Sequence, residues 1–137
     1  SLKISNFIII FGENMSQVQN QQVQNQEQKI IQVLSELIQD LERHKSLLHY
    51  FDNGKYISIH IPIRNTKFFV DSFGFEIERP NLKLTYSCRY DSLTVKIDKV
   101  YYEFKGVVAT FTKSQLRPGY YHIHIIKHRD NYDIIKY

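Results

Sequence analysis

Residues 56–63 read Tyr-Ile-Ser-Ile-His-Ile-Pro-Ile, with an isoleucine at every second position. Side chains of a β-strand point alternately to its two faces, so this spacing predicts a strand whose isoleucine face is buried. In the preceding stretch the apolar residues recur every three or four positions, at Ile30, Leu34, Leu37 and Leu41. Because that spacing is typical of an amphipathic helix, the sequence predicts a helix followed by a sheet.

We place the helix at residues 27–50. The carboxylate of Glu27 favours the positive end of the helix dipole, and Leu48 continues the apolar stripe. Asn53 and Gly54 would end the helix, because both residues tolerate the left-handed backbone conformation that follows many helices. We expect the helix to pack on the first strand through Leu34, Leu37, Leu41, Leu48, Ile57, Ile59 and Ile61.

The helix follows a polar tract, SQVQNQQVQNQEQ at residues 16–28. Such a tract cannot bury enough apolar surface to order itself, so we expect residues 1–28 to be a poorly ordered N-terminal extension. The alternative is that the apolar segment Phe7–Phe11 adds a strand to a sheet edge of this chain or of a neighbour. Residues 29–137 are expected to form a single domain, and Met15, the only methionine, is a candidate natural start.

Stretches with strand periodicity occupy the rest of the chain, and Gly74 predicts a bulge or bend within one of them. Short connections between the stretches imply antiparallel pairing. We therefore expect an α+β fold, with a single N-terminal helix packed on a curved antiparallel sheet or small β-barrel of six to eight short strands. The predicted strands after the first are residues 67–78, 82–90, 92–97, 100–105, 107–112, 120–127 and 132–137.

Composition narrows the class of protein. The longest apolar run, residues 7–11, is far shorter than the roughly 20 residues of a membrane-spanning helix, so we expect no membrane partner. The only cysteine, Cys88, excludes an internal disulfide and cysteine-based zinc sites, and its place on the apolar side of residues 82–90 predicts a buried thiol. This usage favours an intracellular, reducing compartment. Frequent Ile, Lys, Asn and Tyr are typical of AT-rich genomes, some viral ones included.

Basic charge is concentrated in the C-terminal part. Residues 55–137 carry fourteen basic and eight acidic side chains, a net charge of +6, and nine of the ten tyrosines. In single-stranded nucleic-acid binders, basic groups contact phosphates and aromatic rings stack on bases. We therefore expect a small non-catalytic nucleic-acid-binding domain, although tyrosines are also ordinary strand formers. The candidate contacts are Lys83, Arg89, Tyr90, Lys96, Tyr101, Tyr120, Lys127 and Arg129.

Asp91, Glu103 and Lys105 form a candidate catalytic set. Glu103 and Lys105 are two positions apart on a predicted strand, so their side chains share a face. Paired carboxylates can hold Mg²⁺ while a lysine stabilises phosphate charge. The set resembles the Asp…Glu-x-Lys pattern of the PD-(D/E)xK nuclease superfamily. The resemblance implies a metal-dependent nuclease with Mg²⁺ as cofactor, whereas the alternative, an ordinary cross-strand ion pair, needs no cofactor.

A second candidate metal site contains histidines. A single isoleucine separates His122 from His124, so both imidazoles share one strand face, and His60 is a candidate third ligand. The pattern resembles the His-hydrophobic-His motif of HUH endonucleases, which nick single-stranded DNA through a tyrosine. The resemblance implies Tyr50 or Tyr132 as the nucleophile. The alternative is a solvent-facing row of histidines.

A third function remains open, that of a protein-interaction subunit in a larger assembly. A homo- or hetero-oligomer would then form through the aromatic sheet face or through Phe7–Phe11.

Overall fold

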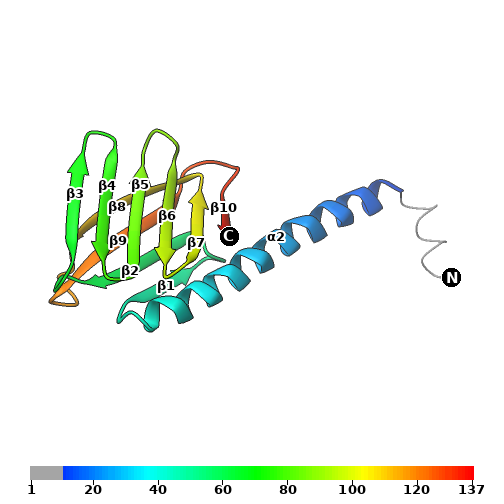
Figure 1. Ribbon diagram of the computed structural model, residues 1–137. Coiled ribbons are helices and arrows are strands. Elements are labelled where there is room, and N and C mark those ends of the chain that lie inside the picture. Colours follow the sequence, from blue (N-terminus) through cyan, green and yellow to red (C-terminus); the bar gives the residue numbers. More distant parts are fainter. Residues whose placement is uncertain (1–10) are drawn as a thin grey trace.

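The computed structural model describes residues 11–137, with side chains from Asn25 onward (Figure 1). Within this range the chain forms one helix, α2 (Phe11–Glu42), and two antiparallel sheets. The four-stranded sheet has the order β1-β2-β9-β8, and the six-stranded sheet has the order β10-β7-β6-β5-β4-β3. The strands are β1 (Leu47–Phe51), β2 (Tyr56–Pro62), β3 (Lys67–Asp71), β4 (Gly74–Arg79), β5 (Leu82–Ser87), β6 (Ser92–Ile97), β7 (Val100–Lys105), β8 (Val107–Lys113), β9 (Tyr120–Lys127) and β10 (Asp133–Lys136).

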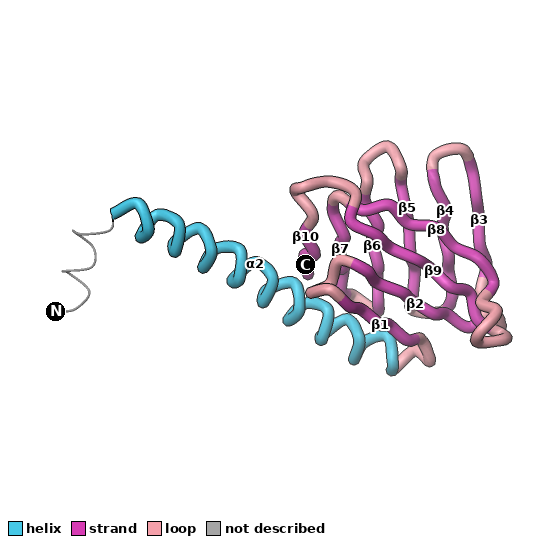
Figure 2. Tube along the Cα trace, turned by 180° about the vertical axis from the view of Figure 1, so that it is seen from behind, coloured by secondary structure: helices cyan, strands magenta, loops and turns pink. Residues whose placement is uncertain are grey.

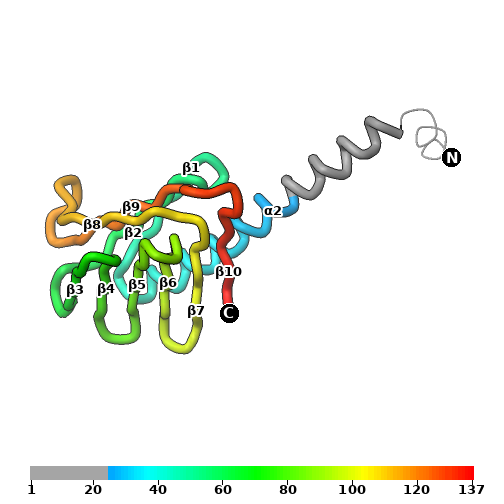
Figure 3. The backbone as a smooth tube through the Cα atoms, turned by 90° about the horizontal axis from the view of Figure 1, so that it is seen from above, coloured from blue at the N-terminus to red at the C-terminus, as the bar shows by residue number. Residues whose placement is uncertain are grey.

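The two sheets form two layers, and their strands run in crossing directions (Figures 1 and 3). The chain passes from one layer to the other at Gly106, the single residue between β7 and β8, which has a φ of 70°. A Cβ atom at this position would lie 3.2 Å from the backbone nitrogen of Tyr132, so the corner favours glycine. The α+β class is confirmed, with two open sheets in place of one curved sheet or barrel.

The core lies between the sheets. Ile57, Ile59 and Ile61 are buried as predicted, and so are the residues of β9 that lie opposite them. The six-stranded sheet contributes alternate residues of β4 to β7, including the fully buried Leu84 and Phe104. Each large apolar side chain removed from water in this way stabilises the fold by about 1.5–3 kcal/mol.

The helix closes one side of this core. Leu34, Leu37 and Leu41 are fully buried, as predicted. Helix α2 contacts β1 and β10, which are the edge strands of the two different sheets, so it covers the opening between them (Figure 2).

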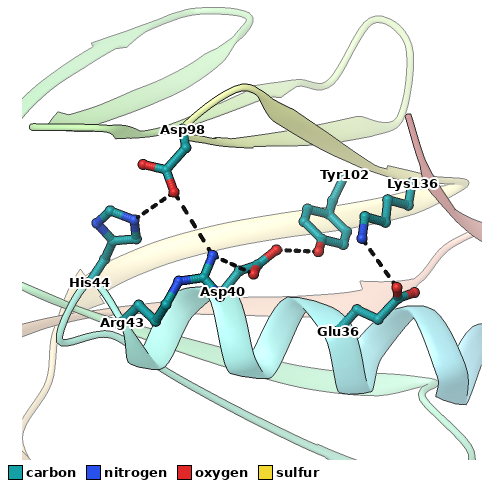
Figure 4. Close-up of polar contacts among 7 residues, drawn as sticks. All are labelled: Glu36, Asp40, Arg43, His44, Asp98, Tyr102 and Lys136. Atoms are coloured by element: carbon teal, nitrogen blue, oxygen red, sulfur yellow. Dashed lines mark hydrogen bonds and ion pairs between the residues drawn. The ribbon is translucent and has the colours of Figure 1, made fainter.

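Polar contacts fix the last turns of α2 against the six-stranded sheet (Figure 4). The hydroxyl of Tyr102, itself fully buried on β7, donates to the carboxylate of Asp40. Arg43 forms an ion pair with Asp40 at 2.6 Å, and Lys136 of β10 forms one with Glu36 at 3.1 Å. Burial and the Asp40 carboxylate both raise the pKa of Tyr102, because they disfavour its phenolate form.

The predicted C-terminal end of the helix is wrong. Helix α2 ends at Glu42, and residues 47–51 form β1 instead of two further helical turns. Lys45, with a φ of 60°, turns the chain, and the backbone nitrogen of Ser46 donates to the carbonyl of Leu41. Leu48 is buried as expected but lies opposite Ile59 in a strand pair, because strand pairing with β2 prevails over the helical spacing.

Three further expectations are corrected. Residues 67–78 form two strands, β3 and β4, and Gly74 follows their hairpin turn rather than making a bulge. A Cβ atom on Gly74 would lie 1.9 Å from the carbonyl oxygen of Tyr86, so no side chain fits there. Cys88 is exposed, because β5 ends at Ser87 and the thiol belongs to the following turn. The division of residues 67–78 and the unforeseen β1 raise the number of strands within residues 11–137 to ten.

At the N-terminal end, residues 7–10 of the segment Phe7–Phe11 lie outside the described residues, and Phe11 begins α2. The helix thus starts well before the expected Glu27 and includes the backbone of the polar tract. Over the described part of the chain, no helix combines the length and the apolar character that a bilayer crossing requires.

Candidate nucleic-acid interface

A polar hollow of about 600 Å³ lies at one end of the six-stranded sheet. Its walls come from the β5–β6 turn, the strands β6 and β7, and the β9–β10 loop, which Figure 1 shows at the same end of that sheet. We call it the β6–β7 hollow. The charged and aromatic residues that line it are Arg89, Tyr90, Asp91, Glu103, Lys105 and Arg129.

The hollow brings together the whole candidate catalytic set. Asp91 precedes β6, while Glu103 and Lys105 lie on β7, opposite Thr94 and Ser92 respectively. All three side chains line this hollow, and the pairing of Ser92 with Lys105 lays the end of β7 beside the start of β6. The chain continues after Lys105 directly into β8, whereas the PD-(D/E)xK pattern requires a helix after the lysine strand.

Both carboxylates of the hollow already have partners. Asp91 forms an ion pair with Arg129, and the Nε2 atom of His128 lies 3.9 Å from its other oxygen. Glu103 accepts hydrogen bonds from the Ser92 hydroxyl at 3.0 Å and from the Tyr137 hydroxyl at 2.8 Å. Among residues 25–137, whose side chains the structure describes, no three His, Cys, Asp or Glu side chains are arranged to hold a metal ion. The carboxylates act in this arrangement as acceptors that position their neighbours.

Two basic side chains of the hollow have no acidic partner among the described residues. Within the described residues neither Arg89 nor Lys105 forms an ion pair, and Arg89 lies over the ring of Phe73, 4.0 Å from its centroid. The adjacent Tyr90 is 78% exposed, more than any other aromatic residue of the described chain. The hollow thus combines two available positive charges with one open aromatic ring.

Three further nucleic-acid candidates, Lys83, Lys96 and Tyr101, continue the sheet face that carries the hollow, since each lies two positions along its strand from a residue that lines it. Lys83, Lys96 and Tyr101 are cross-strand neighbours on the outer face of the six-stranded sheet, and Lys83 is bound to Glu76 at 2.7 Å. Tyr120 belongs to the four-stranded sheet. Lys127 is exposed at the end of β9, opposite Val107, and thus near Gly106 of the hollow. Most of the candidates therefore lie on or beside the outer face of the six-stranded sheet, whereas Tyr120 belongs to the other sheet.

The candidate histidine ligands belong to a row of four on the outer face of the four-stranded sheet. His60 and His122 lie directly opposite each other, with nearly parallel rings 4.7 Å apart. His49 and His124 extend the row, with ring distances of 6.0 Å to His60 and 5.9 Å to His122. His49 was missed because its segment was assigned to the helix. We call this set the histidine row.

The ring nitrogens of the histidine row do not point toward a common centre. The lone pairs of an imidazole lie in the ring plane, so the stacked rings of His60 and His122 direct theirs side by side. Nε2 of His122 lies 3.1 Å from the Ser58 hydroxyl, whereas Nδ1 of His60 is buried and has no partner among the described residues. Burial, followed by the charges of His122, Arg117 and His49, lowers the pKa of His60 to about 4. The pKa of His122 is lowered by burial and by His124.

The two tyrosines considered as nucleophiles are packed against the core. Tyr132 donates its hydroxyl to the carbonyl of Gly54, and burial raises the pKa of this phenol, with a further contribution from Asp133. Tyr50 lies on β1 and is partly buried. Neither side chain belongs to the histidine row.

The fold and the two sites define an α+β protein in which a helix closes a pair of crossed antiparallel sheets. Neither protein-family models, nor curated proteins, nor solved structures provide a match to this chain. Its function is therefore argued from its own residues.

Proposed function

We propose that the β6–β7 hollow binds single-stranded nucleic acid. The observation that carries the proposal is the largely exposed ring of Tyr90 beside two cations, Arg89 and Lys105, that have no carboxylate partner in the described chain. Phosphate groups would be bound by the cations, and a base would stack on the tyrosine ring, which is a sequence-tolerant contact. Arg129 adds a third positive charge, which is partly neutralised by Asp91.

The geometry favours a single strand over a duplex. Stacking on Tyr90 requires a base with an uncovered face, and bases in a duplex are covered by their neighbours. The phosphate contacts need no particular sequence, so we expect binding of both DNA and RNA with little sequence preference.

The test is a fluorescence anisotropy titration with labelled single-stranded DNA, single-stranded RNA and duplex DNA at several salt concentrations. Each phosphate contact contributes about 0.7 to the slope of log K against log salt on single strands. Arg89→Ala and Lys105→Ala should each reduce the slope by about that amount. Tyr90→Ala should weaken binding by about 1–3 kcal/mol without changing the slope.

Matched controls are available on the same chain. Lys99 is exposed in the β6–β7 turn, at the opposite end of the hairpin from the hollow, so Lys99→Ala should leave the slope unchanged. Tyr56→Ala removes an exposed ring from the other sheet and should not affect binding. If the protein does not bind any of the three nucleic acids at low salt, or if the controls weaken binding as much as the hollow variants, the proposal is rejected.

A metal-dependent nuclease is the second candidate, because Asp91, Glu103 and Lys105 line the same hollow. Mg²⁺ or Mn²⁺ would have to displace the hydrogen bonds that Ser92 and Tyr137 donate to Glu103. Cleavage of labelled strands in the presence of either metal, abolished by Glu103→Gln while strand binding persists, would support this activity. Intact substrates with both metals would exclude it and leave the binding proposal in place.

A further inference from the structure

The edge strand β3 exposes an unusual amount of apolar surface. It forms one margin of the six-stranded sheet, and no strand lies on its outer side within residues 11–137. Phe69 is 57% and Val70 is 61% exposed, and Phe68 is about half exposed. The opposite margin, β10, lies against α2, so within the described part of the chain β3 is the uncovered margin of this sheet. Edge strands of this kind are templates for pairing with another strand.

The register shows which backbone groups of β3 are available. Just before β4, the backbone nitrogen of Cys88 donates to the carbonyl of Phe73, and the register of β4 and β5 continues this pairing. Because hydrogen-bonded pairs alternate along an antiparallel ladder, Phe75 and Ile77 also direct their backbone groups to β5. The intervening residues of β4 direct theirs to β3, where their partners are Lys67, Phe69 and Asp71.

It follows that the outer side of β3 presents the backbone groups of the two other residues, Phe68 and Val70. Neither of them is charged, and neither is proline. The charged residues that could discourage pairing, Lys67 and Asp71, stand only at the two ends of the strand.

We infer that β3 pairs antiparallel with β3 of a second copy of this chain, joining the two six-stranded sheets across a twofold axis. In the register proposed, Phe69 lies opposite its own counterpart, and Phe68 lies opposite Val70 of the other copy. The backbone groups of Phe68 and Val70 then face each other, as an antiparallel hydrogen-bonded pair requires. The pairing is self-complementary, which is the condition for a twofold interface.

Charge complementarity identifies a second copy as the occupant. The strand reads Lys-Phe-Phe-Val-Asp, with opposite charges at its two ends. Antiparallel self-pairing places Lys67 of each chain opposite Asp71 of the other, on the same face as Phe69. Neither residue forms an ion pair within the described part of the chain. Charges of opposite sign on directly paired residues stabilise a strand pair. A parallel, in-register pair of β3 strands would instead place Lys67 beside Lys67 and Asp71 beside Asp71.

On the inner face of β3, the Phe68 side chain is already held in place by the four-stranded sheet. The Phe68 ring makes edge contacts with Phe111 and Tyr121 of the four-stranded sheet, with centroid distances of 5.6 and 5.7 Å. A side chain that is held before association loses less conformational freedom on binding. The Val70 side chain of the second copy would cover the exposed part of this ring.

The interface would be small. A single strand buries less than the roughly 800 Å² per partner of a standard interface, so we expect reversible association in about the micromolar range. The inference is independent of nucleic-acid binding, because the β6–β7 hollow and β3 share no residue.

Sedimentation velocity at protein concentrations from about 1 to 500 μM tests the inference, a range set by the expected micromolar affinity. The full chain should shift from monomer to dimer with rising concentration. Phe69→Lys should keep it monomeric at concentrations where the unmodified chain is mostly dimer, because two like charges would then face each other across the axis. Phe51→Lys is the matched control, since Phe51 is an equally exposed phenylalanine on β1 and should leave association unchanged.

A mixing experiment tests the register. Phe69→Lys and Phe69→Glu chains should each be monomeric alone, and an equimolar mixture should form a heterodimer, because opposite charges then meet at the axis. Thermal unfolding verifies that each variant is folded. A chain that stays monomeric over the whole range overturns the inference, as expected if residues 7–10 or another protein cover β3. A dimer that survives in the Phe69→Lys chain also overturns it.

Discussion

His60 is expected to make the stability of this protein fall as the pH drops from 7 to 4. Its environment contains His122 and His124 from β9, His49 from β1, and Arg117 from the β8–β9 loop. Burial, followed by the charges of His122, Arg117 and His49, lowers the pKa of His60 from 6.5 to about 4, because these effects disfavour the imidazolium form. The unfolded chain therefore binds more protons than the folded chain between these two pH values, and the free energy of unfolding decreases through that window.

The size of the effect follows from the shift. One pKa unit corresponds to about 1.4 kcal/mol, so a drop from 6.5 to about 4 sets an upper limit of about 3 kcal/mol. His60 is only partly buried, and solvent reduces the interaction. We therefore expect His60 to account for about 1–2 kcal/mol of the loss. The lowered pKa of His122 acts in the same direction.

The assay is urea denaturation at pH 7 and pH 4.5. His60→Gln removes the titrating group, so this variant should lose about 1–2 kcal/mol less than the unmodified chain on acidification. The reasoning is refuted if the His60 ring titrates near 6.5 in the NMR spectrum of the folded protein, or if His60→Gln does not reduce the acid sensitivity.

Three other predictions concern stability. Leu37→Ala should lower the free energy of unfolding by about 2–5 kcal/mol in urea denaturation, because it leaves a cavity beneath α2; a loss below about 1 kcal/mol would contradict the burial of Leu37. Tyr102→Phe should cost about 1.5–3 kcal/mol, because it removes a hydrogen bond to a carboxylate. Because the pKa of Tyr102 is raised, the free energy of unfolding of the unmodified chain should fall as the pH rises above 10, and that of Tyr102→Phe should fall less. If both chains lose the same free energy of unfolding between pH 8 and pH 10.5, this prediction is wrong. Gly74→Ala should reduce the melting temperature far more than Gly119→Ala, because a Cβ atom collides with a β5 carbonyl only at Gly74; similar melting temperatures would show that the backbone adjusts freely.

The sequence predicted most strands well because their signals are local. Alternating apolar residues and short turns determine where a strand begins and ends, and the predicted bounds of the hairpin β6–β7 and of β9 agree with the structure. The same local register explains why Glu103 and Lys105 share one face of β7 and line the hollow together with Asp91. Leu48 shows the limit of such signals, since it fits both a helical stripe and a strand face and only pairing with β2 decides between them.

Long-range arrangement could not be predicted in this way. Alternation shows which side of a strand is buried but not which of two sheets the strand joins. Tyr120 and Tyr101, both candidate nucleic-acid contacts, therefore belong to different sheets, which alternation alone could not show. Arg129 reaches the hollow only because β9 carries the chain back to Gly106, where two backbone nitrogens of the β9–β10 loop donate to its carbonyl. No local pattern contains that contact.

The position of β9 between β2 and β8 has a consequence for the order of folding. Each of the strands β3 to β6 pairs with the next strand along the chain, so the meander from β3 to β7 can form as soon as its residues leave the ribosome. The four-stranded sheet cannot, because its two halves, β1-β2 and β8, remain separate until residues 120–127 have been synthesised. During that interval β2 lacks the strand that pairs with it on the side away from β1. Nascent chains halted before residue 120 should therefore be the species that chaperones bind and that aggregates most readily.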